Sequence, residues 1–119
     1  MLTPWGEATK VICLEKGISF VLTKEHGGLI LEREYAEKKL SYPARKRGLR
    51  FGDAYVYEMD CAWAIALWEL PHLWSGLGEK VTFNFNGSPE KDLNSILVRY
   101  FPDYLKEYRS IKSYMLCRP

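Results

Sequence analysis

The residues best suited to covalent chemistry are a cysteine and a histidine that lie far apart in the sequence. Cys61 stands at the expected start of an apolar helix, and a helix N-terminus favours the reactive thiolate. His26 could act as its base, with Glu58 or Asp60 orienting the imidazole. Buried cysteines are more common than catalytic ones. We therefore expect Cys61 to be a structural side chain and predict no catalytic residue, with a Cys61-dependent hydrolase as the alternative.

The chain shows no sequence pattern that is typical of a metal-binding or cofactor-binding site. The two histidines, His26 and His72, lie far apart, and the scattered carboxylates show no spacing that would bring them together around a metal. Gly27-Gly28 lacks the following glycines and lysine of a phosphate-binding loop. We predict neither a metal site nor a cofactor.

Basic residues gather in one short segment. Residues 38–50 contain no acidic residue and hold Lys38, Lys39, Arg45, Lys46, Arg47 and Arg50. Such a segment, with aromatic residues interleaved, is typical of a surface that binds phosphates or an acidic partner. The alternative is a solvated loop whose charge is balanced by the glutamates upstream, Glu32, Glu34 and Glu37. We favour a functional role because the charges are concentrated where no regular structure is expected.

Aromatic residues outside the expected core positions add a second indication of a binding surface. Tyrosine, tryptophan and arginine are the usual anchors of protein interfaces. For any one of these aromatics, packing at the edge of the core is the alternative. The predicted partner-binding residues are Tyr42, Arg45, Lys46, Arg47, Arg50, Tyr55 and Trp74.

The composition describes a globular chain with nearly balanced charge. It has 119 residues, of which 47% are hydrophobic and 27% charged, and its formal net charge is +2. These values exclude a polyacidic DNA mimic, a histone-like polycation and a disordered tail. A chain of this length predicts a single domain over residues 1–119.

Cysteine usage and hydropathy bear on the cellular compartment. Three cysteines spread over the chain do not form the dense, even set of a secreted disulfide scaffold. The N-terminus lacks the pattern of a signal peptide. The longest apolar run, residues 62–68, is far shorter than the ~20 residues that span a bilayer. We expect a soluble cytoplasmic protein with no membrane partner.

The patterns along the chain predict an α+β fold. Residues 9–14, 18–23 and 29–31 have the composition or alternation of strands and are joined by short turns, which predicts an antiparallel meander. Residues 32–40 predict a charged helix, residues 41–53 an irregular segment, and residues 60–70 a central buried helix. We therefore expect a small antiparallel sheet packed against three to four helices.

The last third of the chain predicts one short strand and two helices. Residues 79–85 are compatible with a strand. Ser88-Pro89 is a strong helix start, since a capping side chain is followed by proline in the first turn. Phe101-Pro102-Asp103 then separates this helix from a last one that carries Tyr104, Leu105, Tyr108, Ile111 and Met115 on one face.

Four short motifs occur in an order that resembles an uncharacterised family of small domains from phages, plasmids and other mobile elements. They are Thr3-Pro4-Trp5-Gly6, His26-Gly27-Gly28, Tyr57-Glu58-x-Asp60-Cys61-x-Trp63-Ala64 and Tyr100-Phe101-Pro102-Asp103. The chain departs from the family pattern at Met59, where a second acidic residue is usual, and in the basic stretch 45–50. The resemblance implies no established activity and no catalytic residues. It implies an accessory gene that lies beside anti-restriction and other counter-defence functions.

Two binding functions follow as hypotheses. The first is a non-enzymatic protein of a phage or mobile element that inhibits a host defence complex, most concretely an anti-CRISPR acting by steric occlusion. Its partner would be a defence protein or ribonucleoprotein in the cytoplasm of the bacterial host. The second is a small nucleic-acid-binding accessory or regulatory protein that uses the basic segment 38–50.

Overall fold

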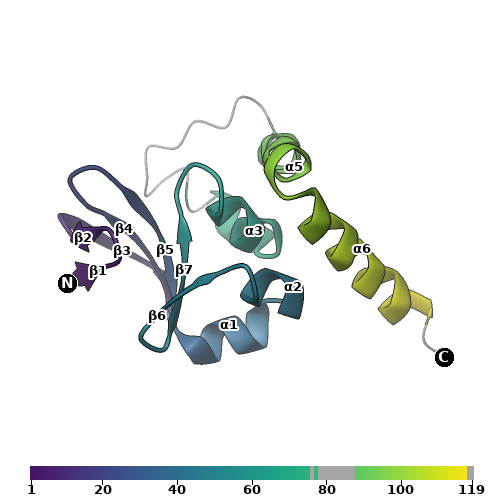
Figure 1. Ribbon diagram of the computed structural model, residues 1–119, viewed down its shortest axis with the longest axis horizontal. Helices are drawn as coiled ribbons and strands as arrows, with labels where there is room; N and C mark the ends of the chain where they lie inside the picture. The colour runs from purple at the N-terminus through teal and green to yellow at the C-terminus, as the bar shows by residue number, and fades with distance from the viewer. Residues whose placement is uncertain (76, 78–87, 118–119) are drawn as a thin grey trace.

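Five strands form the antiparallel sheet of the computed structural model, which describes residues 1–75, 77 and 88–117 (Figure 1). In order across the sheet they are β3 (Lys10–Glu15), β4 (Ile18–Leu22), β5 (Gly27–Leu31), β7 (Ala54–Glu58) and β6 (Leu49–Phe51). A separate hairpin at the N-terminus consists of β1 (Leu2–Thr3) and β2 (Gly6–Glu7). The α+β class and the N-terminal meander are therefore confirmed.

The sheet is wider than predicted because β6 and the neighbouring β7 were not recognised as strands. They form a hairpin around Gly52, whose φ of +61° suits glycine. β7 then pairs with β5 and becomes an interior strand. Its sequence is rich in the aromatic and β-branched residues that favour strands. The expectation that residues 41–53 are irregular is therefore wrong, and a strand signal just after them was missed.

One face of the sheet packs against helices. Successive side chains along a strand alternate between the two faces, and paired residues on neighbouring strands share a face. The strand register therefore places Phe20, Leu29 and Tyr57 side by side on the helix-facing side. All three are buried in the main hydrophobic core. This face positions the helices that carry the candidate site.

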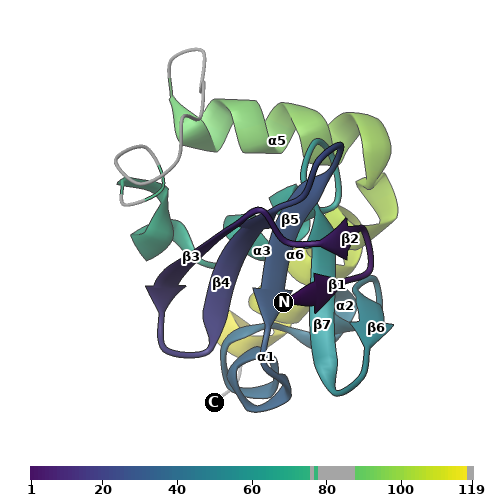
Figure 2. The same cartoon turned by 90° about the vertical axis from the view of Figure 1, so that its left-hand side faces the viewer.

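The opposite face is covered by the N-terminal hairpin, which lies in front of the sheet in Figure 2. Val21, Ile30 and Val56 form a second, smaller apolar cluster there, and Trp5 from the hairpin packs against it. Gly28 makes this contact possible, because a Cβ at that position would lie only 2.7 Å from the Trp5 ring. The hairpin thus covers the middle of the face that the helices leave open.

Five α-helices and one 3-10 turn are present in the described part of the chain, one helix more than the upper end of the prediction. They are α1 (Arg33–Lys39), α2 (Tyr42–Arg45), α3 (Trp63–Trp68), the 3-10 turn η1 (Pro71–Leu73), α5 (Pro89–Tyr100) and α6 (Pro102–Cys117). The additional helix is α2, which falls in the segment expected to be irregular. The helix expected over residues 32–40 is confirmed as α1, and α5 ends and α6 begins at Phe101-Pro102 as expected.

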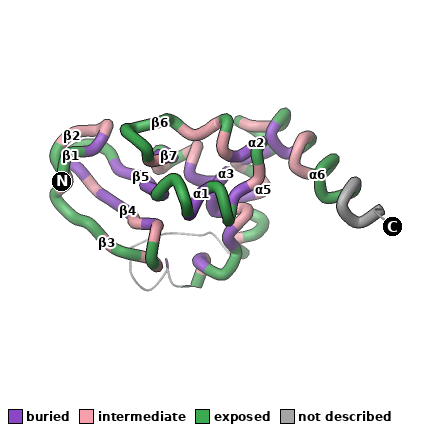
Figure 3. Tube along the Cα trace, turned by 90° about the horizontal axis from the view of Figure 1, so that it is seen from below, coloured by how far each residue is buried: buried purple, intermediate pink, exposed green. Residues whose placement is uncertain are grey.

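α3 is the central buried helix that the apolar run predicted, although it is shorter than residues 60–70. Asp60 has a φ of +91°, which helical residues do not adopt, so Cys61 and Ala62 form a turn ahead of the helix. Figure 1 shows α3 between the sheet and the pair formed by α5 and α6. Burial is concentrated in β4, β5, β7 and α3, whereas residues 109–113 of α6 are exposed (Figure 3). The strand expected over residues 79–85 lies outside the described residues.

Candidate functional site

The short helix α2 carries several of the predicted binding residues, and Glu69 fixes its start. Ser41 caps the helix by accepting a hydrogen bond from the Ala44 amide at 3.3 Å. Glu69, just after α3, accepts hydrogen bonds from the Ser41 amide at 2.7 Å and from the Ser41 hydroxyl at 2.6 Å. The Tyr104 hydroxyl on α6 donates to the same carboxylate at 2.5 Å. Glu69 therefore ties α2, α3 and α6 together.

Tyr57 holds the other end of α2. It is fully buried, and its hydroxyl donates a hydrogen bond of 2.7 Å to the Ala44 carbonyl. Burial, followed by the negative charge of Glu69, raises the pKa of Tyr57, so the hydroxyl stays protonated and remains a donor. A Cβ at Gly48 would come within 2.8 Å of the Tyr57 ring. The chain between α2 and β6 therefore passes so close to Tyr57 that glycine is required there.

Five of the seven predicted binding residues meet around one hollow of about 220 Å³. We call these five side chains the cation–aromatic surface. Tyr42 is its most accessible aromatic, with 64% of the residue exposed. The surface consists of Tyr42, Arg45, Lys46, Arg50 and Tyr55.

Cations lie over the tyrosine rings of this surface. The Arg45 guanidinium carbon lies 5.9 Å and Lys46 Nζ 5.7 Å from the centre of the Tyr42 ring. Arg50 lies closer, 4.3 Å from the centre of the Tyr55 ring, and also donates to the Tyr55 hydroxyl at 3.3 Å. Tyr55 itself is only 8% exposed. A ligand would therefore reach Tyr55 by way of the Arg50 guanidinium, in a cation–π arrangement.

The basic residues of segment 38–50 differ in whether a carboxylate neutralises their charge. Lys46 Nζ lies 2.6 Å and Arg47 Nη2 lies 2.5 Å from the two carboxylate oxygens of Glu107 on α6. These contacts, with the Lys46 hydrogen bond the larger cause, lower the pKa of Glu107, so it stays ionised well into the acidic range. Within the described residues, no ion pair joins Arg45 or Arg50 to a carboxylate. Of the four cations that follow Ser41, Arg45 and Arg50 are thus the two that no carboxylate neutralises in the described residues.

Arg47 and Trp74 are not among the residues around the hollow. Arg47 turns toward α6, with its guanidinium 5.9 Å from the Tyr104 ring centre and a hydrogen bond to the Pro43 carbonyl. Trp74 is half-buried at the edge of the main core, and its indole N–H donates to the Leu67 carbonyl at 2.7 Å. Both side chains have structural partners within the fold.

The structure pairs two of the residues that were considered for a cysteine site. His26 Nδ1 lies 3.5 Å from a Glu58 carboxylate oxygen, so one carboxylate expected to orient the imidazole does lie beside it. Cys61 is half-buried in the turn before α3, where its carbonyl accepts a hydrogen bond from Ala64. No hydrogen bond or ion pair joins His26 to Cys61 in the part of the chain that the structure describes. The Cys61-dependent alternative stays a prediction.

Three residues that shape the site were missed by sequence reasoning. Glu69 offered a signal, since it is the one charged residue in the apolar stretch 61–70 and such a group needs a polar partner. Glu107 and Lys106 offered none, because their proximity to α2 arises only when α6 folds back against it.

Two further observations concern metal binding and membrane spanning. Among the described residues, no three histidine, cysteine or acidic side chains gather closely enough to hold a metal ion. None of the helices described here has the length and apolar character needed to cross a membrane.

Fold and site together define a small α+β domain with a cation–aromatic surface formed by α2, β6 and β7. The chain belongs to a family described as a domain of unknown function, DUF7007, whose family model matches residues 1–114. Membership of an uncharacterised family over most of the chain is thereby confirmed. No curated protein and no solved structure matches the chain.

Proposed function

We propose that this chain is a non-enzymatic nucleic-acid-binding protein and that the cation–aromatic surface is its binding site. The observation that supports this most directly is the position of Arg45 and Arg50 beside tyrosine rings, without a carboxylate partner in the described residues. Guanidinium groups bind phosphate oxygens through paired hydrogen bonds, and exposed rings such as Tyr42 stack on bases. A nucleic acid supplies both groups at regular intervals along one strand.

The rigidity of α2 supports the same proposal. Glu69 and Tyr57 hold the helix from within the fold, through hydrogen bonds of 2.6 to 2.7 Å. A surface that is already fixed loses little conformational freedom when a ligand binds, and so more of the contact energy appears as affinity. The binding residues on α2 are therefore presented by a supported helix and not by a free loop.

The test is fluorescence anisotropy with a labelled single-stranded oligothymidine of about 20 nucleotides. The protein is compared with its double variant Arg45→Ala/Arg50→Ala over salt concentrations from ~50 to ~200 mM. We expect the variant to bind at least about tenfold more weakly at the lowest salt. The slope of log affinity against log salt should also become shallower by roughly 0.7 for each lost phosphate contact.

A matched control separates the surface from net charge. Lys10→Ala/Lys24→Ala removes the same number of positive charges from exposed positions on the β3–β4 side of the sheet, and we expect it to bind nearly as the original protein does. Equal losses in both double variants would show that the site is not the cation–aromatic surface. Absence of any binding at low salt would exclude the nucleic-acid function itself.

A narrower proposal concerns the biological setting. The resemblance to small domains of phages, plasmids and mobile elements supports a role as an inhibitor of a host defence complex, most concretely an anti-CRISPR in the cytoplasm of a bacterial host. The cation–aromatic surface would then cover nucleic acid held by the complex and occlude it. A purified effector carrying guide RNA should lose target cleavage when near-stoichiometric protein is added, and should keep it with Arg45→Ala/Arg50→Ala. Unchanged cleavage with the original protein would contradict this setting.

A further inference from the structure

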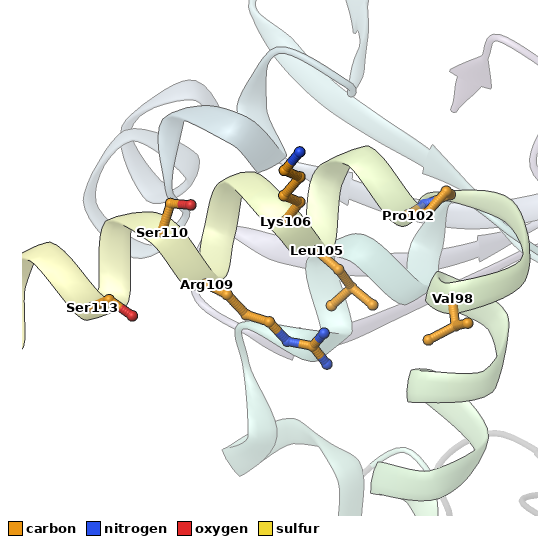
Figure 4. Close-up of a pocket in the computed structure, with 7 residues that line it drawn as sticks. All are labelled: Val98, Pro102, Leu105, Lys106, Arg109, Ser110 and Ser113. Atoms are coloured by element: carbon orange, nitrogen blue, oxygen red, sulfur yellow. The ribbon is translucent and has the colours of Figure 1, made fainter.

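Three hollows follow one another across α2 and α6, and neighbouring hollows share residues. The second hollow, of about 650 Å³, lies between α2 and α6 and shares Tyr42 and Lys46 with the hollow of the cation–aromatic surface. The third, of about 640 Å³, lies along α5 and α6 and shares Lys106 and Ser110 with the second (Figure 4). The three hollows therefore adjoin one another in a path that crosses α6 at Lys106 and Ser110.

Basic side chains accompany this path over its whole length. Figure 4 shows Lys106 and Ser110 on one side of α6 and Arg109 on the opposite side. Lys106 and Arg109 are exposed, and neither forms an ion pair with a carboxylate in the described part of the chain. Arg109 has one weak internal contact, a hydrogen bond of 3.4 Å to the Asn94 side chain. The third hollow has no acidic residue among those that line it.

The second hollow carries the acidic groups of the path. Asp103 and Glu107 both line it, together with Lys46, Arg47 and Lys106. Because Glu107 is already shared between Lys46 and Arg47, basic groups remain in excess there. A polyanion therefore meets favourable charge from the first hollow to the third.

We propose that this path binds an extended single strand of nucleic acid, which begins at the cation–aromatic surface and passes over α6 at Lys106 to reach Arg109. This inference rests on the proposed function and names its ligand more closely. A duplex is stiff and keeps its bases stacked inside, whereas an unpaired strand bends over a helix and turns its bases toward protein side chains.

The lining of the second and third hollows also suits unpaired bases. Each exceeds the ~300 Å³ at which small-molecule sites begin, so each has room for a base. Tyr42, which is exposed, lines the second hollow, and Val98, which is also exposed, lines the third. Both lie beside the cations that would bind the phosphates. Single-strand binding grooves combine cations that follow the backbone with aromatic side chains on which bases stack, and Tyr42 is such an aromatic side chain here.

The test measures how affinity depends on strand length. Oligothymidines of about 4, 8 and 16 nucleotides are titrated into the original protein, into Lys106→Ala/Arg109→Ala and into the control Lys10→Ala/Lys24→Ala. We expect the original protein and the control to gain roughly tenfold in affinity from the shortest to the longest strand. The Lys106→Ala/Arg109→Ala protein should bind the shortest strand equally well and lose most of that gain. A duplex of the longest length should bind more weakly than the single strand.

The possible results distinguish the path over α6 from the proposed function. If Lys106→Ala/Arg109→Ala keeps the full gain with length, or the duplex binds as tightly as the single strand, the path over α6 is wrong. The proposed function survives that result as long as Arg45→Ala/Arg50→Ala still weakens binding. Circular dichroism and thermal melting confirm that each variant is folded, and Lys106→Glu provides a second, stronger perturbation at the crossing point.

Discussion

At the scale of single residues, Glu107 controls how much positive charge α2 offers to a ligand. Its carboxylate lies 2.6 Å from Lys46 and 2.5 Å from Arg47, and their contacts lower its pKa. A phosphate that binds Lys46 must compete with this carboxylate. Under the proposed function, Glu107 would therefore compete with the bound phosphate at the edge of the cation–aromatic surface.

Replacing this carboxylate by a neutral amide should strengthen binding. We expect Glu107→Gln to raise the affinity for single-stranded oligothymidine by up to roughly fivefold, the scale of one exposed ion pair. The dependence on salt should steepen, because Lys46 and Arg47 become free to contact phosphates. Anisotropy titrations over a salt series measure both effects.

The control for this change is Glu34→Gln, which removes an exposed carboxylate on α1 that has no ion pair in the described residues. It carries the same change in net charge. If the two variants gain equally, the effect comes from overall charge, and the competition at Lys46 is refuted.

At the scale of elements, Gly28 on β5 sets the distance between the sheet and the hairpin that covers it. A Cβ there would lie 2.3 Å from the Tyr57 carbonyl oxygen and 2.7 Å from the Trp5 ring. The first of these atoms belongs to the backbone of the neighbouring strand, so it cannot move without disturbing the β5–β7 pairing.

Gly28→Ala should therefore destabilise the fold by about 1–3 kcal/mol or more, as overpacked core positions do. Urea denaturation followed by tryptophan fluorescence measures the change. Gly52→Asn serves as control, because that position has open space and a φ of +61° that asparagine tolerates. A Gly28→Ala protein as stable as this control would show that the hairpin contact is loose.

The predictable elements are those whose signals are local. Alternation predicted β4, the apolar run predicted α3, and Ser88-Pro89 with Pro102 predicted the limits of α5 and α6. α2 could not be predicted in the same way, since its start is held by Glu69 and its end by Tyr57. The candidate site, too, was predictable only where its signals are local in the sequence. The basic and aromatic residues were visible in the sequence, whereas their pairing with α6 depends on contacts across 61 positions of the chain.

At the scale of the whole molecule, one carboxylate joins three distant elements. Glu15 at the end of β3 accepts a hydrogen bond from the Tyr35 hydroxyl on α1, and His72 Nε2 in η1 lies 2.9 Å from the same oxygen. These contacts, the one from Tyr35 first, lower the pKa of Glu15 below its ordinary value of 4.5. The link therefore depends on the ionised carboxylate.

The stability of the protein should fall in acid partly through this link. Because the pKa of Glu15 is lower in the folded state, its contribution is complete above about pH 4.5 and is lost as the pH drops through the folded-state value. We expect Glu15→Gln to be less stable than the original protein near pH 6 and the difference to shrink toward pH 3. Urea denaturation at several pH values measures this. Glu25→Gln, at an exposed turn position, is the control, and a gap that stays constant with pH would contradict the role of Glu15.

The outermost strand β6 has a consequence for the behaviour of the protein at high concentration. Its residues are all exposed, with Leu49 58% and Phe51 37% accessible on either side of Arg50. Such an edge is a template for pairing with another chain, and proteins guard against aggregation by keeping edge strands short and charged. Arg50 supplies that charge here. Under the proposed function, a strand bound at Arg50 would shield the same edge that the free protein leaves open to self-association, which would couple colloidal stability to ligand occupancy.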